Sequence, residues 1–405
     1  MGLQLPDGRS DHLHGGATLK ASITSVDVKS KRVLVREDLN VPMAKGEIAD
    51  DSRIRAAVPT LEHLADRGAK VVVMSHLGRP KGVDPSLSLR PVAVALSKQL
   101  GRDVIFADDC VGEAARSAVG RLQSGQVLLL ENVRFHPEDE ANDPEFARRL
   151  AAFGELFVND AFAASHRAHA SVVGVAEHLP AYAGELMEAE LAALHKALDD
   201  PKRPLVAVVG GAKVSTKVGV LRHLLGKVDA LLIGGAMANT FFRAQGYPTG
   251  SGLVEESALD DAKKVEQQGG KKLVLPVDLV CAKKMEAGQL VEVVAADAVK
   301  AGWMALDIGP KSVAEFGKRI ASASTIVWNG PMGVAEIPEF SEGTRAVGEA
   351  VAGSGAYTLV GGGDTVAAIE SLGLSGFSHV STGGGATLEY LEGKELPGVA
   401  ILKDA

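Results

Sequence analysis

Cysteine is scarce in this chain of 405 residues, which holds only Cys110 and Cys281. Two cysteines are too few for a disulfide-rich secreted scaffold. Neither has a neighbouring residue in the sequence that completes a metal-ligand spacing. We therefore expect two free thiols and a cytoplasmic protein.

Long apolar runs and basic runs are missing as well. No segment approaches the ~20 apolar residues that cross a membrane, and the formal net charge is −8. An acidic chain without basic runs does not suit non-specific nucleic-acid binding. We expect neither a membrane nor a nucleic-acid partner. The first twenty residues contain no apolar stretch that could serve as a secretory signal, so residues 1–20 are predicted to form a flexible extension.

The composition that remains is that of a protein with a large core. Hydrophobic residues make up 46% and charged residues 23% of the chain. At roughly 100–200 residues per domain, this length predicts two domains. Runs rich in Val, Ile and Leu recur along the chain and are continuous rather than alternating, which is typical of parallel strands buried on both faces. They lie at residues 32–35, 70–74, 127–130, 205–209, 230–233 and 325–328.

The segments between these runs are long enough for crossover helices. The pattern therefore predicts an α/β fold with two doubly wound parallel-sheet domains facing each other across a hinged cleft. Residues 185–198 are strong helix formers with an apolar stripe, and they are followed by Pro201 and Pro204. We expect a connecting helix over 185–200 between an N-terminal domain, 21–185, and a C-terminal domain, 186–389.

In the first half, the predicted strands lead into polar and cationic residues. Arginine occurs in five separate segments, and guanidinium groups bind carboxylate and phosphate in a bidentate manner. A lone arginine is usually a surface ion pair, but five segments on one sheet edge favour a site for a small, multiply anionic ligand. The candidates are Arg36, Asp38, Asn40, Arg53, His76, Arg79, Arg134, His166, Arg167 and His169.

In the second half, five strand ends lead into glycine. Glycine allows a phosphate to approach the backbone, and a helix that starts after such a loop offers free N–H groups to an anion. This indicates a nucleotide site, although no Walker A spacing and no early G-x-G-x-x-G motif is present. The loops begin at Gly210, Gly234, Asn329, Gly361 and Thr382.

Four charged residues accompany the glycines. Lys213 and Lys217 are four apart, so a helical turn would place both on one face, where they could bind two phosphates or simply be solvated. Asp364 is a candidate Mg²⁺ ligand or, alternatively, a helix N-cap. Glu336 could accept ribose hydroxyls, or it could be an ordinary surface carboxylate.

Seven segments taken in order resemble phosphoglycerate kinases, from about residue 31 to the C-terminus. The segments are 35–42 (VREDLNVP), 75–80 (SHLGRP), 130–135 (LENVRF), 166–169 (HRAH), 210–213 (GGAK), 328–331 (WNGP) and 361–365 (GGGDT). The resemblance implies reversible, Mg²⁺-dependent phosphoryl transfer between 1,3-bisphosphoglycerate and ADP, giving 3-phosphoglycerate and ATP. It also implies a monomer, and a C-terminal segment, 390–405, that returns to the N-terminal domain.

The resemblance also assigns roles to individual residues. Substrate binding is implied for Asp38, Leu39, Asn40, Arg53, His76, Leu77, Gly78, Arg79, Arg134, Arg167 and His169. Nucleotide binding is implied for Gly211, Lys213, Lys217, Gly235, Asn329, Glu336, Gly361, Gly362, Gly363, Asp364 and Thr365, with Asp364 holding the metal. Arg53, Lys213 and the amides near Gly384 are expected to contact the transferring phosphoryl group. Three positions depart from the family pattern, namely Glu37, Ala163 and Ala335.

Two other classes of protein remain as alternatives on sequence grounds. An NAD-linked dehydrogenase would use a similar fold, but the missing dinucleotide fingerprint and the pair Lys213 and Lys217 argue against it. A non-catalytic nucleotide-binding protein on the same scaffold is disfavoured because the set of Arg, Lys and Asp residues is intact.

Overall fold

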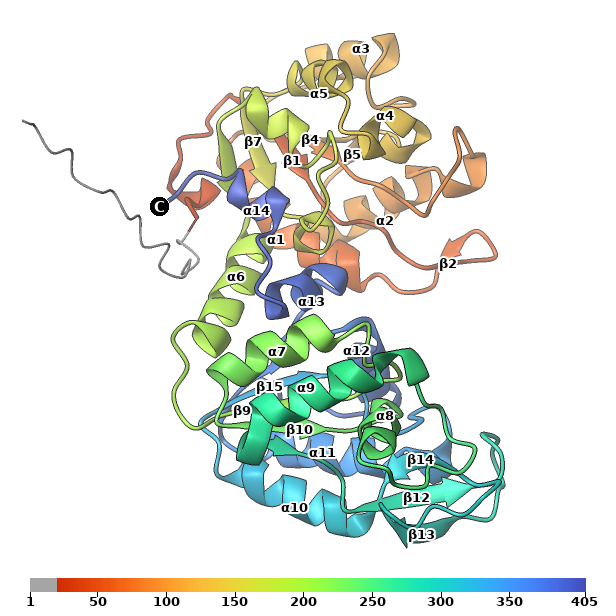
Figure 1. The fold of residues 1–405 in the computed structure, drawn as a ribbon. Helices are drawn as coiled ribbons and strands as arrows, with labels where there is room; N and C mark the ends of the chain where they lie inside the picture. The colour runs from red at the N-terminus through yellow and green to blue at the C-terminus, as the bar shows by residue number, and fades with distance from the viewer. Residues whose placement is uncertain (1–19) are drawn as a thin grey trace, which may run out of the picture.

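The structure is a computed structural model that describes residues 20–405. The prediction for residues 1–20 therefore lies outside the described residues, apart from Lys20. Two sheets of six parallel strands form separate halves of the molecule, and helix α6 (Glu185–Leu198) runs between them (Figure 1). The predicted α/β fold with two doubly wound parallel sheets is confirmed.

The first sheet has the strand order β5-β6-β4-β1-β7-β8. Its strands are β1 (Arg32–Arg36), β4 (Lys70–Met74), β5 (Val104–Phe106), β6 (Val127–Leu129), β7 (Leu156–Asn159) and β8 (Ala181–Ala183). Residues alternate between two apolar clusters on opposite faces, as Val33 and Leu34 do, because both faces are covered by helices. Helices α1 (Ser52–Asp66) and α2 (Arg90–Leu100) cover one face, and α3 (Glu113–Arg121) and α5 (Pro144–Ala151) cover the other.

The second sheet has the order β11-β10-β9-β15-β16-β17. Its strands are β9 (Leu205–Val209), β10 (Ala230–Ile233), β11 (Leu273–Val274), β15 (Thr325–Asn329), β16 (Tyr357–Val360) and β17 (His379–Val380). Helices α7 (Val218–Lys227), α8 (Met237–Ala244) and α9 (Leu259–Gly269) pack on one face, and α10 (Pro310–Ala321), α11 (Glu342–Ala352) and α12 (Gly363–Ser371) on the other. All six apolar runs predicted as strands are strands in the structure.

Smaller elements complete the second half. An antiparallel sheet is formed by β12 (Asp278–Ala282), β13 (Glu292–Ala295) and β14 (Met304–Ile308), and helix α13 (Gly385–Leu391) follows β17. In the first half, a hairpin of β2 (Met43–Ala44) and β3 (Glu47–Ile48) follows β1. Within residues 20–405, none of the helices combines the length and the apolar character needed to cross a membrane.

Helix α6 spans Glu185–Leu198, so the connecting helix predicted over residues 185–200 is confirmed but ends two residues earlier than predicted. Its first turn is held by Asp160, at the end of β7, whose Oδ1 accepts the N–H of Met187 at 2.9 Å. Its apolar stripe, which includes Met187 and Leu194, belongs to one hydrophobic cluster that continues from the first half into the second. The helix therefore joins the two halves through a shared core as well as through the chain.

Glu190 ties the middle of α6 to the second half. Its side chain is fully buried, Oε1 accepts the N–H of Thr382 at 2.7 Å, and Oε2 lies 2.9 Å from His379 Nε2. Burial on its own would raise the pKa of Glu190, but the contacts with His379 and Thr382 outweigh it and hold the pKa below its ordinary value. Glu190 is therefore ionised and fixes the loop between β17 and α13.

The end of the chain lies against the first half. Helix α14 (Pro397–Ala400) sits beside that half in Figure 1, far along the chain from its neighbours. Asn159 Nδ2 donates to the carbonyl of Gly398 at 2.8 Å, and the N–H of Gly398 donates to the carbonyl of Ser165 at 2.9 Å. Residues on both sides of α6 thus form parts of one half.

Replacing Glu190 with glutamine is expected to lower the free energy of unfolding by about 1–3 kcal/mol at pH 7, because charge-assisted hydrogen bonds in a buried site are lost. The pKa of Glu190 is depressed, so its stabilising effect is present above its unfolded pKa and is lost as the pH falls through the folded value. The difference between the two proteins should therefore shrink at acidic pH. Urea unfolding at pH 7 and pH 4 measures this.

Glu188→Gln is the matched control, because Glu188 lies on the same helix, is only half-buried and accepts one hydrogen bond, from Ser22 Oγ at 2.8 Å. Its effect should be smaller than that of Glu190→Gln. Equal losses for Glu190→Gln at both pH values would contradict the assigned role of its charge.

Candidate active site

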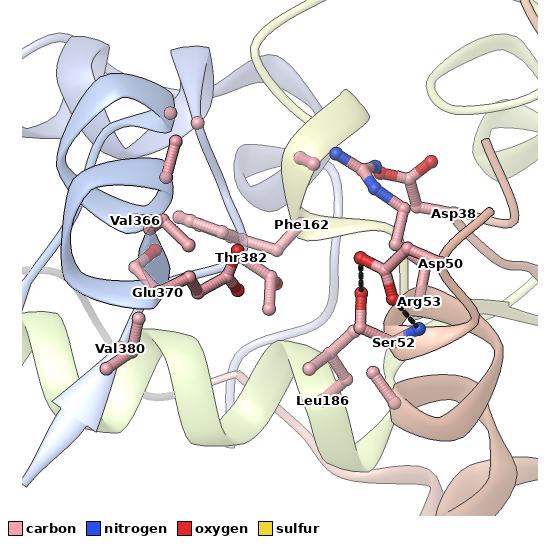
Figure 2. A pocket seen from close by; sticks show the side chains of 16 residues that line it. Asp38, Asp50, Ser52, Arg53, Phe162, Leu186, Val366, Glu370, Val380 and Thr382 are labelled. Carbon is pink, nitrogen blue, oxygen red and sulfur yellow. Dashed lines mark hydrogen bonds and ion pairs between the residues drawn. The ribbon is translucent and has the colours of Figure 1, made fainter. Parts of the chain in front are cut away.

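Two adjoining cavities lie between the halves, with volumes of about 360 Å³ and 240 Å³. Both are lined by Asp38 and Arg53 from the first half and by Gly384 from the second. Figure 2 shows the larger cavity, with Arg53 on one side and Glu370 and Thr382 facing it from the other. The two halves therefore build one continuous site.

The smaller cavity is lined mainly by cationic and imidazole side chains. They are Arg53, Arg79, Arg134, Arg167, His76 and His166, and Asp38, Asn40 and Gly78 lie among them. Guanidinium groups recognise carboxylate and phosphate through paired hydrogen bonds. The cavity therefore suits a small ligand with more than one negative group.

His76 follows β4 and is held by Arg36, a fully buried arginine at the end of β1. Arg36 Nη2 lies 3.0 Å from His76 Nδ1, and because arginine can only donate, Nδ1 must accept. Burial, with help from the nearby Arg36 and Arg134, lowers the pKa of His76 well below its ordinary value. The ring is therefore neutral, carries its proton on Nε2, and can donate to an anion in the cavity.

Arg53 stands where the two cavities meet. It lies in the first turn of α1, which begins after Asp50 accepts the N–H of Ser52 at 2.8 Å. Its guanidinium pairs with the carboxylate of Asp38, which follows β1. Burial lowers the pKa of Arg53, but an arginine stays charged at neutral pH. Arg53 therefore presents a fixed positive charge to ligands on either side.

Arg134 and Arg167 are also held by their neighbours. Arg134, in the short helix η3 (Val133–Phe135), donates through Nη1 to the carbonyl of Gly78 at 2.8 Å. Arg167 Nε donates to His166 Nε2 at 3.0 Å. Each guanidinium keeps further N–H groups for a ligand, so the arginines are oriented before anything binds.

Three predicted substrate residues do not line the cavities. The side chains of Leu39 and Leu77 are buried in the core, and their N–H groups donate to Ser75 Oγ and Asn132 Oδ1. His169 lies behind the lining, with Nδ1 3.9 Å from Asp139 Oδ2. All three support the loops that carry the cationic side chains, which a linear motif cannot distinguish from direct contact.

The glycine loops of the second half stand at the ends of β9, β10, β15, β16 and β17, as predicted. Gly211 has a φ of 113°, and Gly235 has a φ of 71°. A Cβ on Gly235 would lie 2.5 Å from the backbone of Gly211. These two glycines are therefore needed for the close approach of the loops to each other.

The two lysines are placed differently from the prediction. Residues 215–217 form a turn that Lys213 precedes, and helix α7 begins only at Val218, so the prediction of one shared helical face is wrong. Lys213 is exposed. Lys217 is mostly buried, and its Nζ donates to the carbonyl of Gly210 at 2.7 Å and to Asn329 Oδ1 at 2.6 Å. The two lysines are separated because the hydrogen bonds with Gly210 and Asn329 hold the side chain of Lys217 against the loops, whereas Lys213 faces solvent.

Asn329 and Thr365 fix the loops around Lys217. Asn329 is 2% exposed and donates through Nδ2 to the carbonyl of Gly361 at 2.8 Å. Thr365 accepts the N–H of Gly330 at 2.6 Å and donates to the carbonyl of Gly361 at 2.9 Å. Gly362, with a φ of 96°, has no room for a side chain because a Cβ would lie 2.5 Å from Asn329 Nδ2.

Asp364 and Glu336 are both exposed. Asp364 is the second residue of α12, and Gly362 occupies the N-cap position, so the alternative role of Asp364 as an N-cap is wrong. Its carboxylate is close enough to Lys217 for their charges to interact. Glu336 lies on the loop after β15, next to Ala335, which is buried.

Lys213 and Lys217 do not line either cavity. Gly363 and Gly384 line the cavities, but the other predicted nucleotide residues do not. Sequence reasoning named His166 as a candidate of the cationic half but gave no role to Thr382, Gly383 and Gly385, and all four line a cavity. These residues belong to the motifs HRAH and TGGGA. Only the packing of the two halves shows that the two motifs line the same cavity.

Comparisons with known proteins agree with this architecture. The family model of phosphoglycerate kinase matches residues 23–394. The phosphoglycerate kinases of Moorella thermoacetica and Synechococcus elongatus are each 54% identical, over 95% of this chain and 99% and 98% of the relatives. The structure of phosphoglycerate kinase from Coxiella burnetii has a TM-score of 0.88 at 45% identity, covering 94% of this chain and 98% of that one.

A more distant structure, phosphoglycerate kinase from Pyrococcus horikoshii, still has a TM-score of 0.83 at 34% identity. None of these matches supports the alternative of an NAD-linked dehydrogenase. The resemblance inferred from the seven segments is confirmed, and the chain belongs to the phosphoglycerate kinase family of phosphotransferases, whose acceptor is a carboxyl group.

Proposed function

We propose that the chain catalyses reversible, Mg²⁺-dependent transfer of a phosphoryl group from 1,3-bisphosphoglycerate to ADP, giving 3-phosphoglycerate and ATP. Membership of the family supports this reaction in glycolysis or carbon fixation. The observation that carries the proposal is the position of Arg53, which lines both cavities together with Gly384 of the opposite half. The proposed setting is a monomer in the cytoplasm.

The cationic cavity is the proposed site of the three-carbon substrate. Arg79, Arg134, Arg167 and His76 supply donors for its phosphate and carboxyl groups, and Asp38 and Asn40 suit its hydroxyl group. Gly78 contributes the loop that orients Arg134. Leu39, Leu77 and His169 act by supporting these residues.

The glycine loops are the proposed nucleotide site. Gly211 and Gly235 donate their own N–H groups to the carbonyls of Pro331 and Met332, so they would shape the site by letting the loops approach each other closely. Backbone N–H groups at the N-terminus of α12, with Lys213 and Lys217, would hold the phosphates. The residues of that helix start are Gly361, Gly362, Gly363, Asp364 and Thr365. Asn329 positions Lys217 through the 2.6 Å hydrogen bond between Lys217 Nζ and Asn329 Oδ1. Glu336 is exposed, so its carboxylate would accept hydrogen bonds from the ribose hydroxyls.

Asp364 is the proposed Mg²⁺ ligand, and its surroundings fit that role. Its carboxylate is exposed beside Gly363, which lines the larger cavity. Mg²⁺ is usually held by one or two carboxylates together with phosphate oxygens, which Asp364 and a nucleotide would provide. The bound ion would neutralise part of the charge on the phosphates.

The reaction needs no general base, because the attacking carboxylate of 3-phosphoglycerate is already ionised at neutral pH. Catalysis then consists of alignment and charge stabilisation. Arg53, Lys213 and the amides near Gly384 are the proposed donors to the transferring group. Arg53 is already oriented by Asp38, whereas Lys213 is exposed and reaches the group only after the site closes.

Closure about α6 is therefore part of the proposal, with residues 21–185 and 186–389 as the moving domains and 390–405 attached to the first. The lysines lie outside the cavities that Arg53 lines. A hinge that brings them together would also exclude water from the acyl phosphate.

The reaction is tested by measuring ATP formation from ADP, Mg²⁺ and 1,3-bisphosphoglycerate in a coupled assay. The purified chain should form ATP, and no ATP should appear when the acyl phosphate is left out. Nucleotide binding without turnover would overturn the proposal in favour of a non-catalytic nucleotide-binding protein.

Arg53→Ala is expected to lower kcat by at least ~10²-fold, the scale of losing one pre-organised donor to the transition state. Arg55→Ala is the matched control, because Arg55 lies on the same helix, is exposed and, among the residues that the structure describes, forms an ion pair only with Asp51. Steady-state kinetics of both variants provide the comparison. A kcat for Arg53→Ala within a few-fold of the Arg55→Ala value would remove Arg53 from the mechanism.

ADP affinity in the absence of Mg²⁺ is expected to fall as the pH rises from 7 to 9. Burial lowers the pKa of Lys217 to about 8, against a smaller opposing effect of Asp364. At one pH unit above its pKa only about a tenth of the lysine stays protonated, so the loss should reach ~10-fold. Calorimetric titration with ADP measures it.

Lys217→Arg should flatten this pH dependence, because arginine keeps its charge. The exposed Lys213→Arg should leave the shape of the wild-type profile unchanged. A flat profile for the wild-type protein would show that the charge of Lys217 does not act on the nucleotide.

A further inference from the structure

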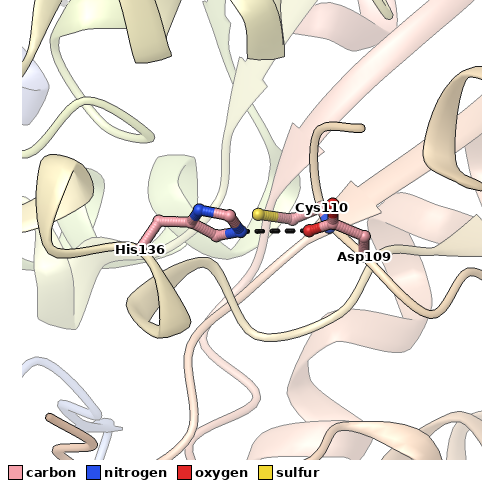
Figure 3. A group of neighbouring side chains, drawn as sticks. All are labelled: Asp109, Cys110 and His136. Carbon is pink, nitrogen blue, oxygen red and sulfur yellow. Dashed lines mark hydrogen bonds and ion pairs between the residues drawn. The ribbon is translucent and has the colours of Figure 1, made fainter. Parts of the chain in front are cut away.

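The first half contains a group of metal-ligating side chains away from the cleft. Asp109, Cys110 and His136 each offer one ligand atom, and these three atoms lie within 4.8 Å of one another (Figure 3). This is the one such group of three among residues 20–405. The sequence around Cys110 completes no metal-ligand spacing, as expected, and only the fold brings the distant His136 to Asp109 and Cys110.

The fold holds these side chains together by itself. Asp109 and Cys110 follow β5, and His136 occupies the N-cap position of α4 (Pro137–Glu140). Asp109 Oδ1 accepts the N–H of Cys110 at 2.7 Å and lies 3.0 Å from His136 Nε2. The imidazole also packs against Phe146, with ring centroids 5.2 Å apart. The three groups are therefore oriented before any ion binds.

The chemistry of the three groups is that of zinc. Zn²⁺ prefers thiolate, imidazole and carboxylate ligands in tetrahedral geometry, at bond lengths that place ligand atoms about 3.4–3.6 Å apart. A separation at the 4.8 Å limit needs to shrink by about 1.3 Å, and the 3.0 Å contact between Asp109 Oδ1 and His136 Nε2 needs to lengthen by about 0.5 Å. Mg²⁺ and Ca²⁺, which prefer oxygen ligands, are excluded by the sulfur and the imidazole.

Solvent reaches two of the three side chains. Cys110 is fully buried, whereas the side chains of Asp109 and His136 are 36% and 29% exposed. An ion can therefore enter past the carboxylate and the imidazole, and water can occupy the fourth position. None of the three residues lines the cavities between the halves.

We propose that Asp109, Cys110 and His136 form a binding site for one Zn²⁺ ion, with the thiolate of Cys110, an imidazole nitrogen of His136 and a carboxylate oxygen of Asp109 as ligands. Binding displaces the thiol proton and the hydrogen bond between His136 and Asp109. The site is separate from phosphoryl transfer, so the proposal stands or falls independently of that activity.

Cobalt is the probe, because Co²⁺ replaces Zn²⁺ in such sites and gives a near-ultraviolet charge-transfer band only when a thiolate is a ligand. Titrating the chelator-treated, full-length protein with Co²⁺ should produce this band with a stoichiometry of about one, and equimolar Zn²⁺ should remove it. A band that is missing from the wild-type protein overturns the proposal.

The two cysteines of the chain supply a matched pair of variants. Cys110→Ser should abolish the band, whereas Cys281→Ser, which removes the other buried thiol on β12, should keep it. His136→Asn changes a partly exposed side chain and should weaken Zn²⁺ binding at least ~10-fold in calorimetry, the effect of losing one ligand. A band that survives in Cys110→Ser, or that is lost in Cys281→Ser, places the metal elsewhere and overturns the site.

Discussion

The joint between the two halves depends on buried carboxylates that fix α6. Asp160 holds the first turn of the helix through Met187, and Glu190 holds the loop after β17 through Thr382. A carboxylate without partners is costly to bury, so both contacts resist being broken. Gly384 stands two residues beyond Thr382, and Thr60 of α1 accepts the N–H of Glu185 at 2.8 Å. Through α6, the helix that carries Arg53 and the loop that carries Gly384 are set against each other.

Asp160 also lies near Glu37, one of the three residues that depart from the family pattern. This side chain is fully buried, and neither carboxylate oxygen has a hydrogen-bond partner within residues 20–405. Burial, and then the nearby Asp160, raise the pKa of Glu37 well above its ordinary value, with Arg36 opposing them. Asp160 itself has a pKa raised to about 6, again by burial. Burial therefore favours the neutral form of Glu37, which is how this carboxyl group is accommodated inside the protein.

In the proposed function, the two halves bind anions by different physical means. The first half uses guanidinium groups fixed by Asp38, Gly78 and His166, so its charges are in place before a ligand arrives. The second half uses loop backbones whose spacing depends on glycine and on Asn329 and Thr365. A fixed array of charges suits a small, rigid anion, and open backbone N–H groups suit a chain of phosphates. The proposed hinge would bring these two surfaces together, because they lie on opposite halves.

The sequence alone determined the elements and the chemical character of each half. Continuous apolar runs marked the strands and an uninterrupted stretch of helix formers marked α6, since these are local patterns of burial and propensity. Only the tertiary structure decided which motif residues reach the cavities. It placed Leu39, Leu77 and His169 behind the cavity lining and added Gly383 and Gly385 to that lining. It also separated Lys213 from Lys217 and set Cys110 beside His136. Contacts between residues distant in the chain arise from the packing of whole elements, and no local pattern encodes them.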